Sequence, residues 1–454
     1  MKVTYDRAIK IVGIGLVSWN RLGPEQWLPE YAIASLHGSD MATLPNTPPV
    51  FSLPQGLKLV PTNTADLVKV ASFRDILENK LPEHAILTYK PITVPTELQH
   101  RKFLMVDPKF TSMYENKVHF RQKFSENLSF PSFVIHERSD LNPAHETYHQ
   151  VMDGREAVVL QDEMLSGGKG TFIVTNEDSY KRALEGLASR SKSKRVVVSD
   201  LVPEARERSI QCCVTEQGVF TGPLQRQIIA HPDITNTAIP AADKFGGAQI
   251  LLEDQDTDLH LQAQQMAQVI GKDLHNSGYR GIFGIDMLLG SDDKLYLIEI
   301  NPRITGVTPL LTALYRGQEG VPFYLLHLLE LGQYPYKITD TSATFDKEGS
   351  ILVIHSHQNH DVILEQTPPS GTYKVENGEL HLMRSSIDLN SLGTEEFVLQ
   401  EYMPPGIIIK AGTRLVTLQF KQKVLDESTN LWYNNIDKVI SVVRASITTR
   451  PIGN

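Results

Sequence analysis

Cysteine, net positive charge and long apolar runs are all scarce in this sequence. Its 454 residues include two cysteines, Cys212 and Cys213, which are adjacent and therefore poorly placed for an ordinary intrachain disulfide. This scarcity predicts a reduced, cytoplasmic chain. No apolar stretch approaches the roughly 18 residues that a membrane-spanning helix requires, so we expect no membrane partner.

The charge balance and two incomplete motifs exclude further classes. The formal net charge is -9, whereas proteins that bind nucleic acid usually carry excess positive charge, so we expect no nucleic-acid partner. Gly13-Ile14-Gly15 lacks the third glycine and the following helix of a dinucleotide-binding fingerprint. The glycine-rich segment 166–170 lacks the spacing of a P-loop. If the chain binds an anion, we expect basic residues clustered at the site itself to bind it.

The most informative stretch is residues 281–308, which read GIFGIDMLLGSDDKLYLIEINPRITGVT. It contains two apolar runs, 282–289 and 295–300, separated by the turn-forming segment GSDDK. Apolar runs joined by a short polar turn are typical of a β-hairpin. The sequence therefore predicts a hairpin here.

The hairpin predicts that two acids face each other. If the turn is centred on the Asp292–Asp293 bond, Asp286 lies directly opposite Glu299. Two such carboxylates among apolar neighbours repel each other unless a cation lies between them, and hard divalent cations prefer oxygen ligands. Strand alternation returns Asn301 and Arg303 to the same face, where they would add an amide oxygen and a guanidinium suited to phosphate.

We call Asp286, Glu299 and Asn301 the acidic row. Together with Arg303 it predicts a magnesium–nucleotide site, and the alternative is a solvated pair of surface acids. The prediction depends on register, because a slip of one residue would move Asp286 to the other face of the hairpin.

The motifs F-G-I-D-M-L and Y-L-I-E-I-N-P-R-I-T-G resemble the metal-binding end of the ATP-grasp superfamily, whose members activate a carboxylate with ATP. The resemblance implies an α/β (α+β) fold with an N-terminal α/β substrate domain over 1–110, a two-part nucleotide clamp over 111–344 and a β-rich domain over 345–454. The order of these parts is similar to that of biotin carboxylase and of pheganomycin-type peptide ligases. The cofactors implied are ATP and two Mg²⁺ ions, with Mn²⁺ as a substitute, bound by Asp286, Glu299 and Asn301.

Residues 157–174 predict a strand, a glycine-rich loop and a second strand. Glycines expose backbone N–H groups, and Lys169 can point at phosphate oxygens, although such a hairpin is also an ordinary turn. Because ATP-grasp proteins close a loop of this kind over the triphosphate, the resemblance implies that Gly167, Gly168 and Lys169 contact nucleotide. The family commonly has Lys-Pro at the end of the first strand, whereas Gln161 stands here, so only an amide hydrogen bond is available to the phosphate.

The strand expected after residue 195 runs into a segment that resembles the family's hinge, where main-chain groups bind adenine. The residues that match it are Asp200, Leu201 and Val202. A following acid would bind the ribose, and both Glu204 and Glu207 are candidates for that role. The alternative for each glutamate is a solvated loop charge.

Two further basic residues are candidates. Lys117, at the start of an expected helix, resembles the lysine that many ATP-grasp proteins place on the nucleotide phosphates, with a surface lysine as the alternative. Arg226, on an expected strand near His231, faces either an anionic substrate or solvent. With Lys169 and Arg303, it would supply fixed positive charge for catalysis.

The expected function is an ATP-dependent ligase that activates a small-molecule carboxylic acid as an acyl-phosphate and joins it to an amine or amino acid. No protein nucleophile is needed, because positioning and electrostatics suffice. An ATP-grasp carboxylase, a thioester-forming ligase and a nucleotide-binding protein without turnover are alternatives. The oligomeric state is open, and a homodimer is possible.

A zinc-dependent hydrolase is the alternative from another class. His355, His357 and His360 resemble the zinc motif of metallo-β-lactamase-type hydrolases, although Asn359 replaces the required aspartate.

Periodicity predicts the remaining elements. Helices are expected over 64–81, from 116 to 128, around 259–274 and over 307–332, and a loop over 241–249. Short strands are expected after residue 345, the last of them over 439–446.

Overall fold

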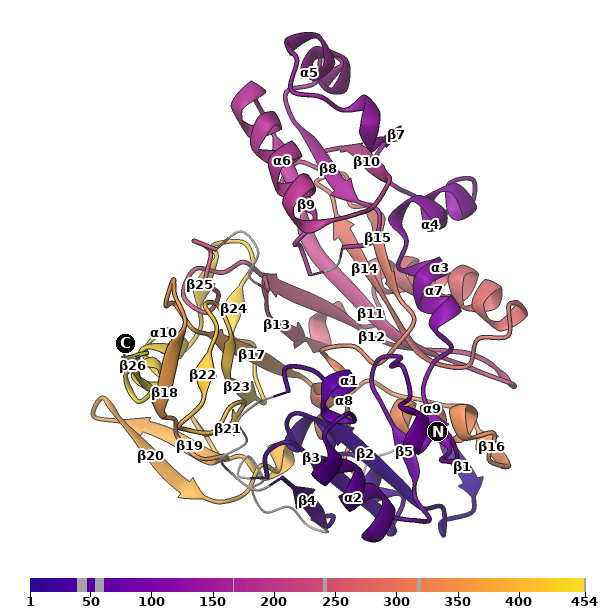
Figure 1. Ribbon diagram of the computed structural model, residues 1–454, viewed down its shortest axis with the longest axis vertical. Coiled ribbons are helices and arrows are strands. Elements are labelled where there is room, and N and C mark those ends of the chain that lie inside the picture. The colour runs from indigo at the N-terminus through magenta and orange to yellow at the C-terminus, as the bar shows by residue number, and fades with distance from the viewer. Residues whose placement is uncertain (39–46, 54–60, 166, 240–242, 317–319, 453–454) are drawn as a thin grey trace.

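The computed structural model describes residues 1–38, 47–53, 61–165, 167–239, 243–316 and 320–452. Three sheet-based parts are visible in Figure 1, with the N-terminal part at the bottom and the C-terminal strands on the left. Within the described residues, no helix has both the length and the apolarity that crossing a membrane would require.

The N-terminal part is built on a parallel sheet with the order β4-β3-β2-β5-β6. Its strands are β2 (Ile11–Gly15), β3 (Tyr31–Ser35), β4 (Val50–Ser52), β5 (Ala85–Leu87) and β6 (Phe103–Leu104). β2 and β3 are buried along their whole lengths, as expected for strands covered on both faces. The expected helix over 64–81 is two helices, α1 (Thr64–Leu67) and α2 (Ala71–Asn79), because Val70 adopts an extended conformation between them.

A four-stranded antiparallel sheet with the order β7-β10-β8-β9 forms the top of the molecule (Figure 1). Its strands are β7 (Phe133–Glu137), β8 (Val158–Asp162), β9 (Thr171–Val174) and β10 (Arg195–Asp200), and the helices α5 (His145–Met152) and α6 (Glu177–Arg190) cover one face. The expected strand, loop and strand over 157–174 are therefore confirmed as β8 and β9.

One ten-stranded antiparallel sheet joins the middle of the chain to its C-terminal part, in the order β15-β14-β11-β12-β13-β17-β23-β21-β19-β20. Its strands are β11 (Arg206–Thr215), β12 (Gly218–Ile229), β13 (Phe245–Ile250), β14 (Gly281–Leu289), β15 (Leu295–Asn301), β17 (Gly349–His355), β19 (Gly371–Glu376), β20 (Glu379–Arg384), β21 (Phe397–Glu401) and β23 (Arg414–Phe420). Helix α7 (Asp258–Asn276) packs on β11 and β12 through an apolar cluster. Because β13 pairs with β17, the sheet runs across the domain boundary predicted at 344/345, and the three domains remain a prediction.

The remaining elements connect these parts. They are α3 (Pro108–Tyr114), α4 (Lys117–Phe124), α8 (Thr308–Leu314), α9 (Phe323–Gly332), β1 (Lys2–Tyr5) paired with β16 (Tyr336–Asp340), a sheet of β18 (Val362–Gln366), β22 (Ile408–Ile409) and β26 (Thr448–Pro451), the pair β24 (Leu425–Asp426) and β25 (Leu431–Trp432), and α10 (Ile436–Ala445). The expected helical stretch over 307–332 is thus two helices, and Pro322 immediately precedes the second.

The secondary structure predicted for two segments was wrong. Residues 245–249 form a strand and not a loop, because glycines let β13 approach β17 closely: a Cβ on Gly247 would lie 2.0 Å from the Ile351 carbonyl oxygen. The rest of that expected loop includes residues 240–242, which lie outside the described ranges. The strand expected over 439–446 belongs to helix α10, whose buried Ile436, Ile440 and Val443 follow helical spacing.

Candidate active site

The two predicted acids face each other on β14 and β15. Asp286 pairs with Glu299 in the antiparallel register, as predicted. On the turn side of this pair the register is different, since Met287 pairs with Leu297 and the strand bulges around Ile298. Without that extra residue Asp286 would face Ile298, so the bulge is what brings the two carboxylates onto one face.

Asp286 lies at the centre of a polar network. Its Oδ1 accepts a hydrogen bond from Gln227 Nε2 at 2.5 Å, and its Oδ2 accepts one from Asn301 Nδ2 at 2.8 Å. Burial raises the pKa of Asp286, and the negative charge of Glu299 raises it further. A charged pair at this position therefore requires a compensating cation.

A hard divalent cation fits the donor set of this row. Asp286, Glu299 and Asn301 present carboxylate and amide oxygens, and the two Asp286 oxygens retain lone pairs beyond the hydrogen bonds that they accept. Among the described residues, no three His, Cys, Asp or Glu side chains form a metal-binding group. Two carboxylates without a third protein anion are typical of a magnesium site that substrate phosphates complete.

Hydrogen bonds to Glu115 and Asn301 hold Arg303 beside this row. Its Nε donates to Glu115 Oε1 at 2.7 Å, and its Nη2 donates to Asn301 Oδ1 at 2.7 Å. Glu115, which lies between α3 and α4, was not predicted, because nothing in its local sequence marks it. The pairing fixes the orientation of the guanidinium.

Lys117 is buried and not on the surface. It is the first residue of α4 and is 2% exposed. Its Nζ donates to the Leu165 carbonyl at 2.8 Å and lies 3.8 Å from Glu299 Oε2. The structure therefore excludes the surface alternative and places this ammonium between the β8–β9 hairpin and the acidic row.

Gln161 stands on β8 with a positive charge behind it. Its Oε1 accepts a hydrogen bond from Nη2 of Arg121 at 2.7 Å, and Arg121 is fully buried. Burial lowers the pKa of Arg121 to about 10. Arg121 was missed by the sequence analysis, although its spacing of four residues from Lys117 places both on one face of α4.

The glycine-rich hairpin lies against a distant part of the chain. Gly167 and Gly168 have φ angles of 66° and 74°, which glycine adopts most readily. A Cβ on Gly168 would lie 3.3 Å from Lys244 Cγ, so the hairpin tip touches the segment before β13. Lys169 is exposed, while Ser166 lies outside the described residues.

Lys90 is a basic residue of the site that the sequence analysis missed. The charge of Arg303 is the largest cause that lowers the pKa of the exposed Lys90, and Lys169 contributes in the same direction. Glu115 and Glu299 act in the opposite direction, so all four side chains lie within electrostatic range of Lys90. Its position after β5 is a usable signal, because parallel strands present ligand-binding loops at their carboxyl ends.

The predicted hinge follows β10. Asp200, the last residue of β10, accepts a hydrogen bond from Arg155 at 2.8 Å. Leu201 is 37% exposed. Val202 packs against the β14–β15 turn, where a Cβ on Gly290 would lie 3.4 Å from Val202 Cγ1. Glu204 is exposed, with a φ of 49°.

Glu207 is half-buried on β11, and burial raises its pKa. Strand alternation puts Glu207 on the same face as Ser209, which pairs with Asp286. Its burial on the face of the acidic row favours Glu207 over Glu204 as the ribose acid.

Arg226 does not join the other candidates, which corrects the expectation that it faces the substrate. It pairs with Arg208, which in turn pairs with Met287, so it lies on the opposite face of the sheet from Asp286. There its guanidinium contacts Asp254 at 2.6 and 2.7 Å. The neighbouring Gln227 reaches Asp286 instead.

The histidine cluster does not form a zinc site, and the hydrolase alternative is wrong. His355 is buried with its Nε2 3.1 Å from the Phe245 carbonyl, and His357 Nε2 accepts from Arg444 at 2.8 Å. His360 is exposed, and none of the described His, Cys, Asp or Glu side chains makes a three-membered metal group here. Burial lowers the pKa of His355 to about 4, so its ring is a neutral core side chain.

Comparison with known protein families finds a match in the middle of the chain. Residues 114–307 match the model of a family described as an ATP-grasp domain. Butirosin acyl-carrier protein–L-glutamate ligase from Niallia circulans is 26% identical over 175 residues, which are 38% of this chain and 39% of that relative. The match therefore spans well under half of that protein.

Solved structures show the same fold over nearly the whole chain. The biotin carboxylase domain of Hydrogenobacter thermophilus 2-oxoglutarate carboxylase is 12% identical with a TM-score of 0.62, over 97% of this chain and 91% of that chain. Biotin carboxylase from Campylobacter jejuni has a TM-score of 0.61 at 11% identity, over 98% and 92%. Carboxyaminoimidazole ribonucleotide synthase from Aspergillus clavatus has a TM-score of 0.54 at 14% identity, over 97% and 100%. The predicted α/β fold is confirmed, and the structure adds that the N-terminal sheet is parallel while the central and C-terminal sheets are antiparallel.

Proposed function

Because this chain is an ATP-grasp domain protein, we propose that it is an ATP-dependent ligase that joins a substrate carboxylate to an amine. The observation that carries the proposal is the pairing of the half-buried Asp286 and Glu299 in a row that also holds the buried Asn301. Two facing carboxylates are suited to binding a divalent cation, and the basic residues beside them are suited to the phosphates of its nucleotide.

The reaction consists of two substitutions. A carboxylate oxygen of the acid attacks the γ-phosphorus of ATP, and the bond from that phosphorus to the β,γ-bridging oxygen breaks. ADP departs as the leaving group, and the acid becomes an acyl-phosphate. The amine nitrogen then attacks the acyl carbon, inorganic phosphate departs with its bonding electrons, and the amine proton passes to solvent. Magnesium at Asp286, Glu299 and Asn301 supplies positive charge to the phosphates when it is bound.

The fixed cations of the chain divide the remaining work. Arg303, oriented by Glu115, presents its guanidinium beside the acidic row, where charge develops on the transferring phosphoryl group. Lys117 approaches from α4, Lys169 from the β8–β9 hairpin, and Lys90 from the N-terminal sheet. These charges converge from separate elements, so they are preorganised before the reaction begins.

The nucleotide lies between the two antiparallel sheets in this proposal. Main-chain groups of Asp200 to Val202 bind adenine, and Glu207 accepts from the ribose hydroxyls. Gln161 donates to the α-phosphate, while the charge of Arg121 behind it substitutes for the lysine that the family commonly has at this strand end.

The form of the substrates follows from the relative. Its name describes the ligation of L-glutamate and an acyl-carrier protein, which supports an amino acid as one substrate and a carrier-bound group as one form of the other. A free carboxylic acid with an amine or amino acid is the other form. A cytoplasmic location and a homodimer remain predictions.

Removal of either acid tests the proposal. Asp286→Asn and Glu299→Gln keep the size of the side chain and remove one charge, so we expect both variants to fold while ADP formation falls by more than about 100-fold. The measurement is ADP release with ATP, Mg²⁺ and pooled carboxylic and amino acids, with circular dichroism to check folding. Glu177→Gln on α6 is the matched control and retains turnover. Turnover like that of the wild type in either acid variant contradicts the assignment.

Additional arms of the assay separate the alternatives. ADP release that requires bicarbonate identifies a carboxylase, and release that requires coenzyme A identifies a thioester-forming ligase. Tight ATP binding without ADP in every arm identifies a binding protein. Hydroxamate formation in the presence of hydroxylamine traps the acyl-phosphate of the proposed ligase.

A further inference from the structure

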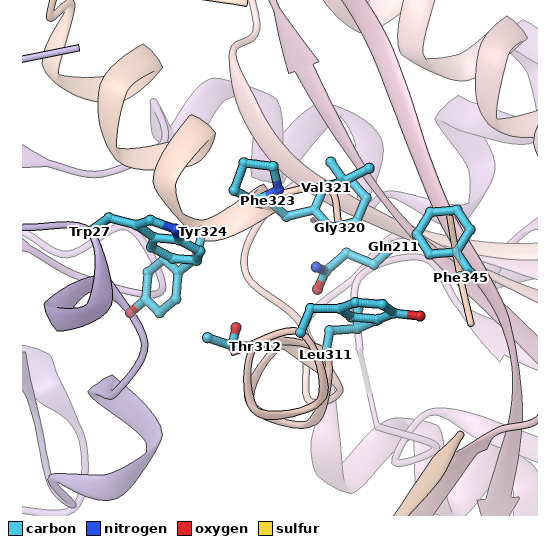
Figure 2. Close-up of a pocket in the computed structure, with 11 residues that line it drawn as sticks. Trp27, Gln211, Leu311, Thr312, Gly320, Val321, Phe323, Tyr324 and Phe345 are labelled. Atoms are coloured by element: carbon cyan, nitrogen blue, oxygen red, sulfur yellow. The ribbon is translucent and has the colours of Figure 1, made fainter. Parts of the chain in front are cut away.

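The cavity shown in Figure 2 is too small to bind a substrate group. It lies between Trp27 of the N-terminal part, Leu311 of α8, Tyr324 of α9 and Phe345, and Gln211 of β11 is also part of its lining. Its interior has room for about one water molecule. This cavity therefore belongs to the packing between the N-terminal part and the central sheet.

A pair of histidines lies on α5, at the top of the molecule in Figure 1 and away from β14 and β15. Residues 145–149 read HETYH, so His145 and His149 are four positions apart and lie on one face of the helix. Histidines in an H-E-x-x-H pattern on a helix can bind zinc together. Such a short pattern also arises by chance, so the assignment depends on how the two side chains lie.

The two imidazole rings direct their Nε2 atoms at each other. These atoms are 2.9 Å apart, and the ring planes are nearly perpendicular, at 82°. Two nitrogens bound to one tetrahedral zinc at about 2.0–2.1 Å are about 3.3 Å apart. Because both side chains are exposed, a small rotation about their side-chain torsions would open the pair to that separation.

A carboxylate of α6 orients His145 as a metal ligand would be oriented. Glu177 Oε2 lies 2.9 Å from His145 Nδ1, and since an ionised carboxylate only accepts, Nδ1 carries the proton. In the neutral ring, Nε2 therefore holds the lone pair that can bind a metal. Histidines that bind metals commonly donate their other N–H to a carboxylate, which fixes the ring and makes it a more basic ligand. Lys181 contacts the other oxygen of Glu177 at 2.7 Å, which helps to keep this acid ionised.

Aromatic and apolar contacts hold α5 against α6. The ring of Tyr148 lies 5.8 Å from that of Tyr180 and 5.2 Å from that of His149. Val151 and Met152 of α5 are buried in the same apolar cluster as Tyr180. Because this packing fixes the helix, both imidazoles are presented together before a metal binds, and binding has less conformational freedom to remove.

The pair lacks the ligand set of a zinc hydrolase. Catalytic zinc sites usually have three protein ligands and one open position. Within the described ranges, no third His, Cys, Asp or Glu joins His145 and His149, and Glu177 contacts the other ring nitrogen of His145. Water would complete the coordination, so we expect an affinity lower than that of a closed four-ligand site.

We propose that His145 and His149 form a second metal site, which binds Zn²⁺ and is separate from the magnesium site of the acidic row. Imidazole nitrogens suit zinc, whereas carboxylate and amide oxygens suit magnesium. On binding, each Nε2 bonds to the metal, and the proton that His149 Nε2 donates to His145 passes through solvent to His149 Nδ1. The bound ion would tie α5 to α6 through Glu177. This inference does not depend on the ligase function.

Calorimetric titration of Zn²⁺ into the full chain at neutral pH tests the proposal, with Mg²⁺ in large excess to occupy the acidic row. We expect one saturable site. His145→Ala and His149→Ala should each weaken Zn²⁺ binding at least tenfold, and Glu177→Gln should weaken it about tenfold while ADP formation with Mg²⁺ is unchanged. Circular dichroism checks that the variants fold.

Two further variants serve as controls. His381→Ala on β20 also removes an exposed histidine beside a glutamate, here Glu379 at 3.9 Å, and should leave Zn²⁺ binding unchanged. Asp286→Asn should bind Zn²⁺ as the wild type does, because the proposed site does not include the acidic row.

Two failures are distinguishable in this design. The absence of saturable Zn²⁺ binding, wild-type affinity in the double variant His145→Ala/His149→Ala, or loss of Zn²⁺ binding in Asp286→Asn overturns the second metal site. The absence of ADP formation with every acid and amine overturns the ligase function and leaves the zinc site standing.

Discussion

Individual residues show where the sequence was sufficient and where it was not. Asp286 and Glu299 could be predicted as a pair because a hairpin relates nearby positions by a simple register. Gln227 and Glu115, which contact this row, come from segments far away in sequence, and no local pattern indicates them. The pair itself was predicted from a regular hairpin, yet a bulge around Ile298 is what aligns it.

Arg121 predicts the effect of placing at position 161 the lysine that the family commonly has there. Gln161→Lys would place an ammonium against the fully buried Arg121 guanidinium, so we expect the unfolding free energy to fall by about 2 kcal/mol. Adding Arg121→Met should recover most of that loss, because the like charge is gone. Urea unfolding of the two single variants and the double variant measures the coupling. Simple additivity of the two changes would contradict this account of the pair.

At the scale of elements, the errors have one physical origin. Gly246 and Gly247 read as a loop from their residue type alone, but a side chain on Gly246 would meet Ile234 and one on Gly247 would meet the Ile351 carbonyl of β17. The β-branched residues of 439–446 favour a strand, yet burial of one helical face of α10 outweighs that propensity. In both elements, tertiary packing outweighs the local conformational preference of the residues and determines the secondary structure.

The β8–β9 hairpin carries a prediction at this scale. Gly168→Val should raise KM for ATP severalfold, because a side chain would be strained at a φ of 74° and would press on Lys244. Initial rates over a range of ATP concentrations give the measurement.

The matched control is Gly378→Val in the β19–β20 turn, where φ is 83° and a Cβ would meet nothing within 4 Å. It should lose similar stability without changing KM for ATP. An equal change in KM for both variants would show that hairpin geometry is not involved.

At the scale of the molecule, the fold class followed from the motifs but the sheet order did not. β13 and β17 are neighbours in one sheet, although the β14–β15 hairpin, strand β16 and the helices α7, α8 and α9 separate them in the chain. The pairing of such distant strands depends on packing throughout the core. A short stretch of sequence carries no information about that packing.

Buried histidines predict how the stability of the whole chain depends on pH. Burial lowers the pKa of His327 to about 3 and that of His355 to about 4, whereas a histidine in an unfolded chain titrates near 6.5. Between these values the unfolded chain binds protons that the native chain does not, so the unfolding free energy should decrease as pH falls from about 6.5 towards 4.

Each of these histidines contributes a slope of about 1.4 kcal/mol per pH unit. Denaturant unfolding across this range should show a smaller slope for His355→Gln than for the wild type. His360→Gln, at an exposed position, should leave the slope unchanged. An unaltered slope in His355→Gln would contradict the assignment of a neutral, buried ring.

The central claim is that Asp286 and Glu299 together bind a divalent cation with its nucleotide. Electron paramagnetic resonance of Mn²⁺ titrated into the chain with ADP measures this directly, since free and bound Mn²⁺ give different signals. We expect saturable, nucleotide-dependent binding by the wild type, weakened at least tenfold in both Asp286→Asn and Glu299→Gln. Binding of Mn²⁺·ADP with undiminished affinity by these two variants would contradict the account.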